Sequence, residues 1–368
     1  MIDLKEWVKS VGPENFRQEF LAALATKKLR VEEVSYKQLA AACKYNDEDS
    51  QEQEHRTIFG SLFETTALAL LAYKIKEGYD NDAGFVGDKL TTDLQKPPEL
   101  YWDDKGSFVN GTKSFRPPIP TNYDKKHDYL TTTSSTSTKT LSIQAELVAF
   151  DQTGEINRRA MSLGYFLRQT KERTIIRGIT EADCDAGRYV YRQGSPLYCE
   201  DGSNRNWVGR GNTTSPGAYS QPLPLHSKHD FLKAVDYRLD ETYPGYSTRP
   251  TRPLYGTDSR QLLVPEVLRG QVMKALLWDN PHEFSVDIMS SPFIDEQGGR
   301  ALKNWYLGEF KSQFVWQDIV PLTVSLYSKA ESAATFLPHV AICIKAQYLG
   351  KIHAANSPIC VTKIDGGD

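Results

Sequence analysis

The residue group with the clearest metal-binding chemistry is His226-Ser-Lys-His229-Asp230, which brings two imidazoles and a carboxylate together. A zinc site needs three or four converging ligands, usually carried on helices or strands at fixed spacing. The surrounding segment is rich in proline, so we expect a loop there. The two histidines are therefore predicted to be exposed to solvent, with no bound metal.

Motifs for phosphate binding and nucleophilic catalysis do not occur in the sequence. Gly209-Arg-Gly211 has the glycines of a phosphate-binding loop, but no strand is predicted before it and no helix after it, so we expect a turn. The adjacent carboxylates Asp103-Asp104 and Asp240-Glu241 are typical of turns and surfaces, and adjacency alone does not indicate an acid/base pair. We therefore predict no catalytic residue, no cofactor, no metal ligand and no enzymatic activity.

Cationic side chains gather on a helix predicted from Glu155 to Gly178. Its apolar stripe is flanked on one side by Arg158, Arg159, Arg173 and Arg177 and on the other by Arg168 and Lys171. These cations could contact nucleic acid, but they could also form ion pairs with neighbouring subunits or stay solvated. We favour solvation or contacts between subunits.

Aromatic residues are concentrated in the middle of the chain. They are Tyr189, Tyr191, Tyr198, Trp207, Tyr219, Tyr237, Tyr243 and Tyr246. Such side chains could line a sugar-binding face, because their rings stack on apolar faces of ligands. Packing at an interface or within the local loops is the interpretation that we favour.

The overall composition excludes several functional classes. The 44 Lys and Arg nearly balance the 47 Asp and Glu, giving a formal charge of −3, so binding of nucleic acid through bulk charge is not expected. The most apolar stretch, from Phe59 to Ile75, is interrupted by charged residues, so no membrane span is expected. The mixed charges of the first ten residues argue against a secretory or transit leader.

The five cysteines are widely spaced and odd in number. This usage favours free thiols in a reducing compartment over a disulfide framework. A bridge between Cys184 and Cys199 stays open as the alternative.

Two helices are predicted in the first third of the chain. Pro13 lies in the first turn of a short amphipathic helix, and a charged, solvated connector from Asn46 to Arg56 follows. The second helix, from Ile58 to Lys76, is apolar on nearly every side. Such a helix needs partners on more than one side.

The segment from Pro97 to Lys139 is predicted to be extended and poor in core residues, and it includes a Ser/Thr tract from Thr131 to Thr138. Asn110-Gly111 is its strongest hairpin signal, because a type I′ turn needs positive φ at both central residues. The two strands would be Phe108-Val109 and Thr112 to Phe115. We therefore expect a projecting two-stranded arm.

Alternating apolar residues predict a strand from Thr140 to Phe150, and Asp151 to Gly154 then leads into the helix from Glu155 to Gly178. The apolar stripe of that helix consists of Ile156, Ala160, Leu163, Leu167, Thr170 and Thr174. Gly194 to Gly256 is rich in Pro and Gly and predicts a loop-rich insertion. The remaining predicted elements are a helix from Pro265 to Trp278, strands at Phe284–Ile288, Ile319–Leu326, Phe336–Ile344 and Ile359–Ile364, and an apolar run at Phe310–Trp316.

The order of these elements resembles the major capsid protein of tailed double-stranded DNA phages, with the Hong Kong 97-type fold, including Mu-like head subunits. Four stretches carry the resemblance: Val148 to Ala160, Leu262 to Leu268, Trp305 to Phe310 followed by Phe314 to Val324, and Val340 to Ile352. The first is similar to the entry into that family's spine helix, and the third is similar to its late strand pair.

The resemblance implies an α+β fold made of several parts. They are an N-terminal arm with helices (1–98), an extended loop that forms the projecting hairpin (99–139), a peripheral domain (140–180 and 310–348) with the spine helix at 155–178, an axial domain (181–295) with a Pro/Gly/Tyr-rich insertion at 194–256, and a connecting segment with a C-terminal strand (296–309 and 349–368).

The same resemblance implies a non-catalytic protein that assembles into homo-hexamers and homo-pentamers of an icosahedral shell around double-stranded DNA. The implied partners are other copies of the chain, scaffold, portal and decoration proteins, and DNA bound without sequence specificity; no membrane is implied. The implied location is the virion, after assembly in the host cytoplasm. Two alternatives stay open: an encapsulin-like compartment, and a soluble glycan-binding or hydrolytic protein that uses the Tyr/Trp-rich region 189–246.

Overall fold

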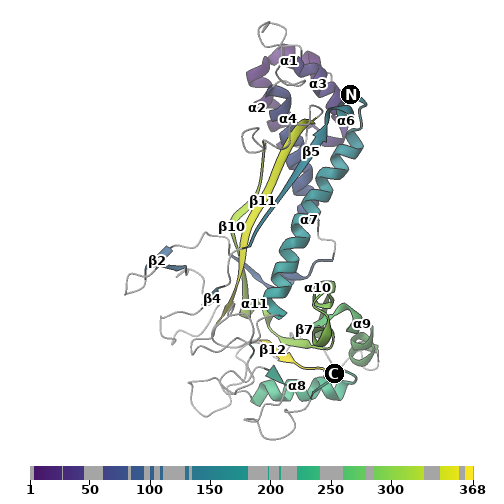
Figure 1. The fold of residues 1–368 in the computed structure, drawn as a ribbon, viewed down its shortest axis with the longest axis vertical. Helices are drawn as coiled ribbons and strands as arrows, with labels where there is room; N and C mark the ends of the chain where they lie inside the picture. The colour runs from purple at the N-terminus through teal and green to yellow at the C-terminus, as the bar shows by residue number, and fades with distance from the viewer. Residues whose placement is uncertain are drawn as a thin grey trace. The chain divides into compact units, whose positions relative to one another are not determined.

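The computed structural model describes residues 4–26, 28–44, 61–81, 84–94, 100–102, 108–110, 129–131, 135–180, 198, 207–208, 222–240, 260–278, 286–326, 340–355 and 361–367. Helices and sheets are both present and partly segregated along the chain, so the predicted α+β class is confirmed. The chain divides into a first unit (1–83, 136–170 and 320–349) and a second unit (84–135, 171–319 and 350–368). Three long elements contribute residues to both units: α7 (Thr153–Thr180), β10 (Phe314–Leu326) and β11 (Val340–Ala355) (Figure 1).

Helices open the first unit: α1 (Leu4–Val11), α2 (Pro13–Ala25), the 3₁₀ turn η1 (Val31–Glu33), α3 (Tyr36–Lys44) and α4 (Ser61–Tyr79). Gly12 joins α1 to α2 with φ 82°, a conformation that glycine adopts without strain, and Pro13 then begins α2 as predicted. The ring centroid of Trp7 lies 5.3 Å from that of Phe16, in an edge-on arrangement, and 6.0 Å from that of Phe20, in a tilted one. Both phenylalanines are fully buried, so aromatic packing holds α1 against α2.

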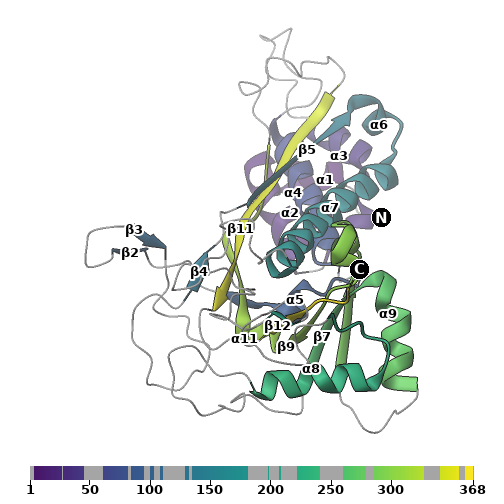
Figure 2. The same ribbon diagram turned by 60° about the horizontal axis from the view of Figure 1, so that its bottom comes forward.

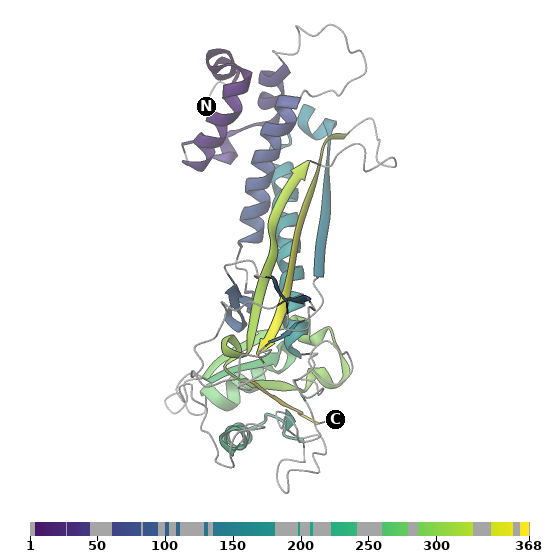
Figure 3. The ribbon, with the colours of Figure 1, turned by 90° about the vertical axis from the view of Figure 1, so that its left-hand side faces the viewer.

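Helix α4 lies close along the first half of α7, and Figure 3 shows the two helices side by side. The contact is made through glycines on both helices. A Cβ on Gly164 would overlap the carbonyl oxygen of Ile75 and lie 2.8 Å from the backbone nitrogen of Tyr79, and a Cβ on Gly78 would lie 2.8 Å from the carbonyl carbon of Met161. Since α4 also contacts α2 and α3, its predicted need for partners on several sides is confirmed.

The strand predicted from Thr140 to Phe150 is wrong in its second half. Strand β5 covers Ser135–Gln144, and the short helix α6 covers Ala145–Ala149. The apolar alternation continues into Ala145–Ala149, but Ala, Glu and Leu are strong helix formers and decide the local structure. β5 also begins inside the Ser/Thr tract, so the extended segment ends earlier than predicted.

The turn from α6 into α7 is held by side-chain hydrogen bonds. Asp151 has φ 55°, the only positive φ of a non-glycine residue in the described part of the chain. Its carboxylate accepts hydrogen bonds from the hydroxyls of Ser35 and Thr153, the latter at 3.1 Å. The Thr153 hydroxyl in turn accepts from the backbone N–H of Tyr36 at 3.1 Å. The predicted entry into the long helix at Asp151 to Gly154 is therefore confirmed, and α3 is tied to it.

β10 and β11 are the centre of a five-stranded sheet with the order β1-β10-β11-β4, in which β5 also pairs with β11. Along β11 the residues Ile342, Ile344, Ala346 and Tyr348 are buried, and the residues between them are half-buried. This alternation is typical of a sheet with one face in the core. The strand predicted at Ile319–Leu326 is confirmed, with β10 beginning earlier, at Phe314; the strand predicted at Phe336–Ile344 is confirmed from Val340 and ends later, at Ala355, while residues 336–339 lie outside the described residues.

The predicted extended segment leaves and rejoins this sheet within the second unit. Strand β1 (Thr92–Leu94) precedes the segment and runs parallel to β10, with Thr92 opposite Val315. Strand β4 (Tyr129–Thr131) lies within the predicted segment and runs antiparallel to β11, with Thr131 opposite His353. The chain is therefore held in one sheet on both sides of residues 95–128, which we call the extended segment from here on.

A hairpin lies inside the segment, but in a different register from the predicted one. Strands β2 (Leu100–Trp102) and β3 (Phe108–Asn110) pair antiparallel as a separate two-stranded sheet, with Leu100 opposite Asn110. Asn110 is thus at the open end of the hairpin and not in its turn. Residues 103–107, between the two strands, lie outside the described residues. The predicted partner strand Thr112 to Phe115 lies outside the described residues.

The second unit contains another sheet, with the order β6-β12-β9-β7-β8. Its strands are β6 (Trp207–Val208), β7 (Arg260–Pro265), β8 (Val286–Ser291), β9 (Trp305–Gly308) and β12 (Val361–Ile364). Helices α8 (Lys228–Asp240) and α9 (Glu266–Met273), the latter continued by a π turn at Lys274–Trp278, lie beside it (Figure 2). Leu262, Val264, Val272 and Trp305 form its buried core together with Phe231 of α8.

Helix α8 corrects the prediction that Gly194 to Gly256 is only a loop-rich insertion. Phe231 and Ala234 of α8 are buried in the core of the second sheet, which stabilises the helix despite the prolines around it. The predicted helix at Pro265–Trp278 is confirmed by α9 and its π turn. The apolar run Phe310–Trp316 divides into the one-turn helix α11 (Phe310–Gln313) and the start of β10.

Candidate functional site

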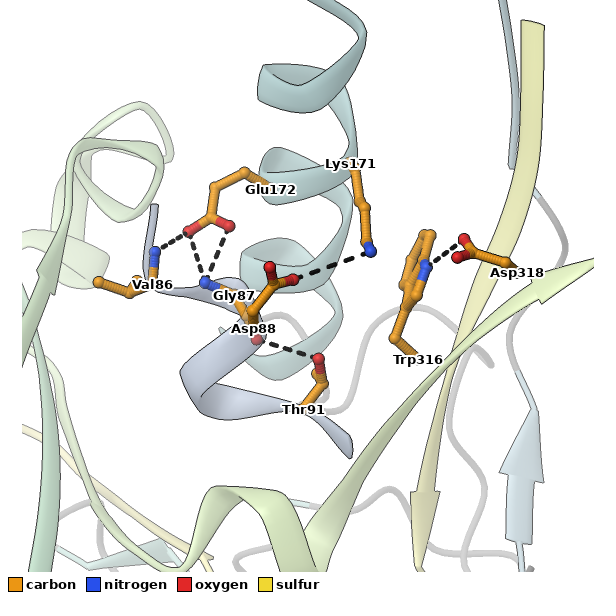
Figure 4. A network of polar contacts seen from close by, with 8 residues as sticks. All are labelled: Val86, Gly87, Asp88, Thr91, Lys171, Glu172, Trp316 and Asp318. Carbon is orange, nitrogen blue, oxygen red and sulfur yellow. Dashed lines mark hydrogen bonds and ion pairs between the residues drawn. The ribbon is translucent and has the colours of Figure 1, made fainter. Parts of the chain in front are cut away.

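Figure 4 shows a network of polar contacts centred on Glu172 of α7, in the second unit. Its side chain is only 2% exposed. The carboxylate accepts hydrogen bonds from the backbone N–H of Val86 at 2.8 Å and from that of Gly87 at 2.8 and 2.9 Å. Charge-assisted hydrogen bonds of this kind are stronger than neutral ones. Glu172 thus fixes the chain at residues 86–87 against the long helix.

The residues that follow continue this attachment up to β1. Helix α5 (Gly87–Leu90) begins at the bound N–H groups, and the Thr91 hydroxyl donates to the Gly87 carbonyl at 3.0 Å. A Cβ on Gly87 would lie 3.2 Å from Cδ of Glu172 and still closer to its carboxylate oxygen. The Thr92 hydroxyl donates to the carbonyl of Lys311 at 3.0 Å. The chain is therefore held firmly just before it enters the extended segment.

Lys171, next to Glu172, extends the network to the sheet. It is 5% exposed, and its Nζ lies 3.8 Å from a carboxylate oxygen of Asp88 and 5.4 Å from the ring centroid of Trp316. Trp316 is fully buried and donates from Nε1 to Asp318 at 2.7 Å. A Cβ on Gly350 of β11 would lie 2.9 Å from Cε2 of that ring. The same network therefore binds β10 and β11, the two strands that hold the ends of the extended segment.

The contacts of this network position the backbone of residues 86–87. Glu172 is saturated by backbone donors, and Lys171 is packed between an acid and an aromatic face. Its arrangement fits an anchor for the extended segment, which we name the anchor network (Val86, Gly87, Asp88, Thr91, Lys171, Glu172, Trp316 and Asp318; Figure 4).

Replacing Glu172 by alanine is expected to lower the free energy of unfolding by about 2 kcal/mol, because two buried N–H groups lose their acceptor. Hydrogen exchange should rise most at the amides of Val86 and Gly87. Glu296→Gln is a matched control, since Glu296 forms an exposed ion pair with Arg173 at 2.8 Å and its loss should cost less than about 1 kcal/mol. Equal effects of the two substitutions, measured by denaturant unfolding, would contradict the anchor.

Helix α8 begins within the His226 to Asp230 group, at Lys228, so the predicted loop is wrong for residues 228–230. Asp230 accepts hydrogen bonds from the backbone N–H of Ser227 at 3.0 Å and from its hydroxyl at 2.8 Å, an arrangement that caps the helix. His226 and His229 are exposed, and the ring of His226 contacts the amide of Gln271. In the ranges that the structure describes, no three His, Cys, Asp or Glu residues are grouped as a metal site.

The aromatic candidates for a sugar-binding face are only partly described. Tyr198 is fully buried, and its ring centroid lies 5.8 Å from that of Tyr306, so it packs in the core and is not available to a sugar. Trp207 and Tyr237 lie in β6 and α8, but the described part of the chain excludes their side chains. The other five aromatic residues, Gly209 to Gly211 and the Asp103-Asp104 pair lie outside the described residues.

The cations of α7 differ from the prediction on one flank. Arg168 and Lys171, expected to be solvated or to contact other subunits, are 7% and 5% exposed. The guanidinium of Arg168 lies 5.9 Å from the ring centroid of Tyr79. The buried stripe begins with Ile156, Ala160 and Leu167 as predicted, but it then passes to Lys171, Glu172 and Ile175 because the second half of the helix has different partners.

On the other flank Arg158 is exposed, Arg159 and Arg173 are half-buried, and all three are paired within the chain. Arg173 lies 2.8 Å from Glu296, and its guanidinium stacks over the ring of Phe293 at 5.3 Å. Arg158 and Arg159 both bind Glu155, at 2.8 and 2.7 Å.

Hydrogen bonds from Arg158 and Arg159 lower the pKa of Glu155 from 4.5 to about 2. Since this pKa is below its unfolded value, the interaction stabilises the folded state above about pH 4.5 and is lost as the pH falls toward 2. An NMR titration of the Glu155 carboxyl carbon should therefore have its midpoint near 2. The double substitution Arg158→Gln with Arg159→Gln should return the midpoint to about 4.5, and an unchanged midpoint would contradict this assignment.

Other features are reported for the described residues only. No helix there is both long and apolar enough to cross a membrane. Cys43 and Cys343 are free thiols, as predicted, and the remaining three cysteines lie outside the described ranges.

Sequence reasoning missed the role of Glu172. Arg168, Lys171, Glu172 and Ile175 share one helical face, but at 3.6 residues per turn that face is turned by about 110° from the predicted apolar stripe, so the stripe gives no signal for Glu172. The partners of Glu172 could not be predicted either, because they are backbone N–H groups, which nearly every residue type carries.

No protein-family model and no curated protein sequence matches the chain. Among solved structures, the chain is similar to the virus-like particle from Pyrococcus furiosus (11% identity, TM-score 0.39, covering 80% of this chain and 97% of that one). It is also similar to the capsid of Cyanophage Pam1 (9%, 0.42, 74% and 84%) and to the mature capsid of bacteriophage PhiM1 (11%, 0.40, 78% and 89%). With TM-scores below 0.5, these are partial likenesses in fold.

Proposed function

We propose that this chain is the major subunit of an icosahedral, tailed-phage-type head, with a structural and non-catalytic role. The observation that carries the proposal is the attachment of the extended segment on both sides. Strand β1 pairs with β10, strand β4 pairs with β11, and the anchor network fixes the chain just before β1.

The hairpin β2–β3 inside this segment is a two-stranded sheet separate from the two larger ones. An isolated hairpin of this size is marginally stable in water and gains stability when it packs against another surface. A neighbouring subunit supplies that surface in a shell. The firm attachment of the segment to the sheet and the need of its hairpin for a packing partner together favour an intersubunit arm over a catalytic loop.

In this proposal the α7, β10 and β11 region (140–180 and 310–348) is the peripheral domain, 181–295 is the axial domain, and 99–139 is the extended loop. Residues 1–98 form the N-terminal arm and helices, and 296–309 with 349–368 connect the parts. The subunits form hexamers and pentamers around double-stranded DNA in a virion assembled in the host cytoplasm. Scaffold, portal and decoration proteins are the further partners.

Particles isolated from producing cells and treated with nuclease test this proposal. We expect a sedimenting shell made of this chain that retains nuclease-resistant, double-stranded DNA. Shells that retain a defined protein cargo and no DNA would favour an encapsulin-like compartment instead. If the chain stays in the soluble monomer fraction while other head proteins sediment, the shell proposal is wrong.

A further inference from the structure

A surface formed by α7 and β5 in the first unit combines cations with exposed aromatic rings. We name it the cationic face; its residues are Lys139, Arg158, Arg159, Tyr165 and Phe166. The Lys139 ammonium lies 4.4 Å from the centroid of the Phe166 ring. Tyr165 and Phe166 are 38% and 42% exposed, which is unusual for neighbouring large side chains on a long helix.

The charge of the cationic face is only partly neutralised. Among the ion pairs of the described residues, Glu155 is the acid bound to this face, and it is shared by two arginines whose side chains are 70% (Arg158) and 40% (Arg159) exposed. Arg158 uses Nε and Nη2 on Glu155, whereas Arg159 uses Nε alone. Within the described residues, the terminal nitrogens of Arg159 have no recorded acceptor. The face therefore keeps an excess of positive charge and of N–H donors.

The same chain carries a segment of opposite charge. Residues 47–54 hold Asp47, Glu48, Asp49, Glu52 and Glu54 with no Lys or Arg among them. Tyr45 precedes this acidic segment, and Ile58-Phe59 follows it. Carboxylates accept charge-assisted hydrogen bonds from the guanidinium groups of arginine, and the flanking apolar residues can pack against exposed aromatic rings. Residues 45–60 lie outside the described part of the chain, so the match is between the residue types of this segment and the described side chains of the cationic face.

We propose that the acidic segment 47–54 of one copy binds the cationic face of a second copy. This inference rests on the proposed function and names one of its subunit contacts. Segment and face are different surfaces of the same chain, so the contact is head-to-tail, and such contacts close into rings when the rotation permits. Exposed charges make it sensitive to salt.

Double-stranded nucleic acid is the less suitable occupant. Three cations, of which one is offset by Glu155, would replace few counterions, and tight backbone binding uses more contacts. A duplex also offers the exposed rings no apolar partner, whereas the acidic segment brings three apolar or aromatic flanking residues.

Charge reversal on both surfaces tests the contact. The segment variant carries Asp47→Lys, Glu48→Lys and Asp49→Lys, and the face variant carries Lys139→Glu, Arg158→Glu and Arg159→Glu. Each alone places like charges together, so the protein concentration for half-assembly, measured by light scattering, should rise about tenfold or more. Mixed in equal amounts, they should assemble again, because every contact in an alternating ring is then complementary.

Native mass spectrometry of the mixture should find even-membered rings in which the variants alternate, since a five-membered ring cannot alternate. Arg17→Glu with Lys28→Glu is the control: both residues are exposed, they lie in or directly after α2, which contributes no residue to the cationic face, and assembly should be unchanged. The milder face variant Arg158→Gln with Arg159→Gln guards against misfolding, and thermal unfolding checks every variant.

The outcomes separate this inference from the proposed function. If the wild-type chain assembles and both reversed variants assemble equally well, the contact is wrong while the shell stands. If mixing gives no recovery although both variants are folded, the segment does not bind a second copy, and binding to its own chain replaces the proposal. If the face variant assembles normally but loses co-purified nucleic acid, the face binds nucleic acid. If wild type never assembles, the proposed function itself fails.

Discussion

Gly164→Ala is expected to lower the free energy of unfolding by about 3 kcal/mol or more and to reduce soluble yield sharply. The new methyl group would overlap the carbonyl oxygen of Ile75 and lie 2.8 Å from the backbone nitrogen of Tyr79. Both are backbone atoms of a packed helix and cannot turn aside as a side chain could. Helices α4 and α7 must therefore separate, which exposes the buried apolar residues between them.

The control is Gly154→Ala in the first turn of the same helix. A Cβ at Gly154 meets no atom within 4 Å, so alanine should be neutral or stabilising by up to about 1 kcal/mol. Chemical denaturation of both variants gives the comparison. Similar stabilities for the two substitutions would contradict the close helix contact at Gly164.

Removing the extended segment is expected to abolish assembly while the subunit still folds. The substitution replaces residues 95–128 by eight Gly and Ser residues and leaves β1 and β4 in place. These strands lie at the two ends of the order β1-β10-β11-β4, about 14 Å apart at the usual strand spacing, and eight flexible residues span about 16 Å. The linker therefore reaches without strain.

Thermal unfolding should show a cooperative transition close to that of the full chain, and light scattering should detect no particles at any concentration. Glu172→Gln is a useful companion, because it keeps the segment and weakens only its anchor; assembly should persist at a higher threshold concentration. If the chain without residues 95–128 forms normal particles, the extended segment is not an intersubunit arm, and the main argument for the proposed function is lost.

Long elements with strong patterns were predictable from the sequence. The 28-residue helix α7 and the strands β10 and β11 follow from apolar spacing that repeats over many residues. The turn at Asp151 to Gly154 was predictable because Asp accepts a left-handed conformation and its side chain bonds to the next turn.

Short elements and close contacts were not predictable, for separate physical reasons. The hairpin signal of Asn110-Gly111 was overridden by cross-strand pairing of β2 and β3. Helix α8 was hidden because its stability comes from burial of Phe231 in a core built from distant strands. The contact at Gly164 depends on which helix lies opposite, which one chain segment cannot reveal.

The candidate site was only half visible in the sequence. The cations of α7 were identified, and the buried position of Lys171 was not, because desolvation of a lysine depends on partners such as Trp316 that lie far away in the chain. The anchor network relies on backbone N–H groups at Val86 and Gly87, which any residue could supply.

Single-particle electron microscopy of the purified chain, with light scattering over a range of protein and salt concentrations, tests the shell subunit most directly. We predict hollow polyhedra, or rings of five and six subunits, whose formation depends on protein concentration. A monodisperse 41.5 kDa monomer under every condition would contradict the proposed function.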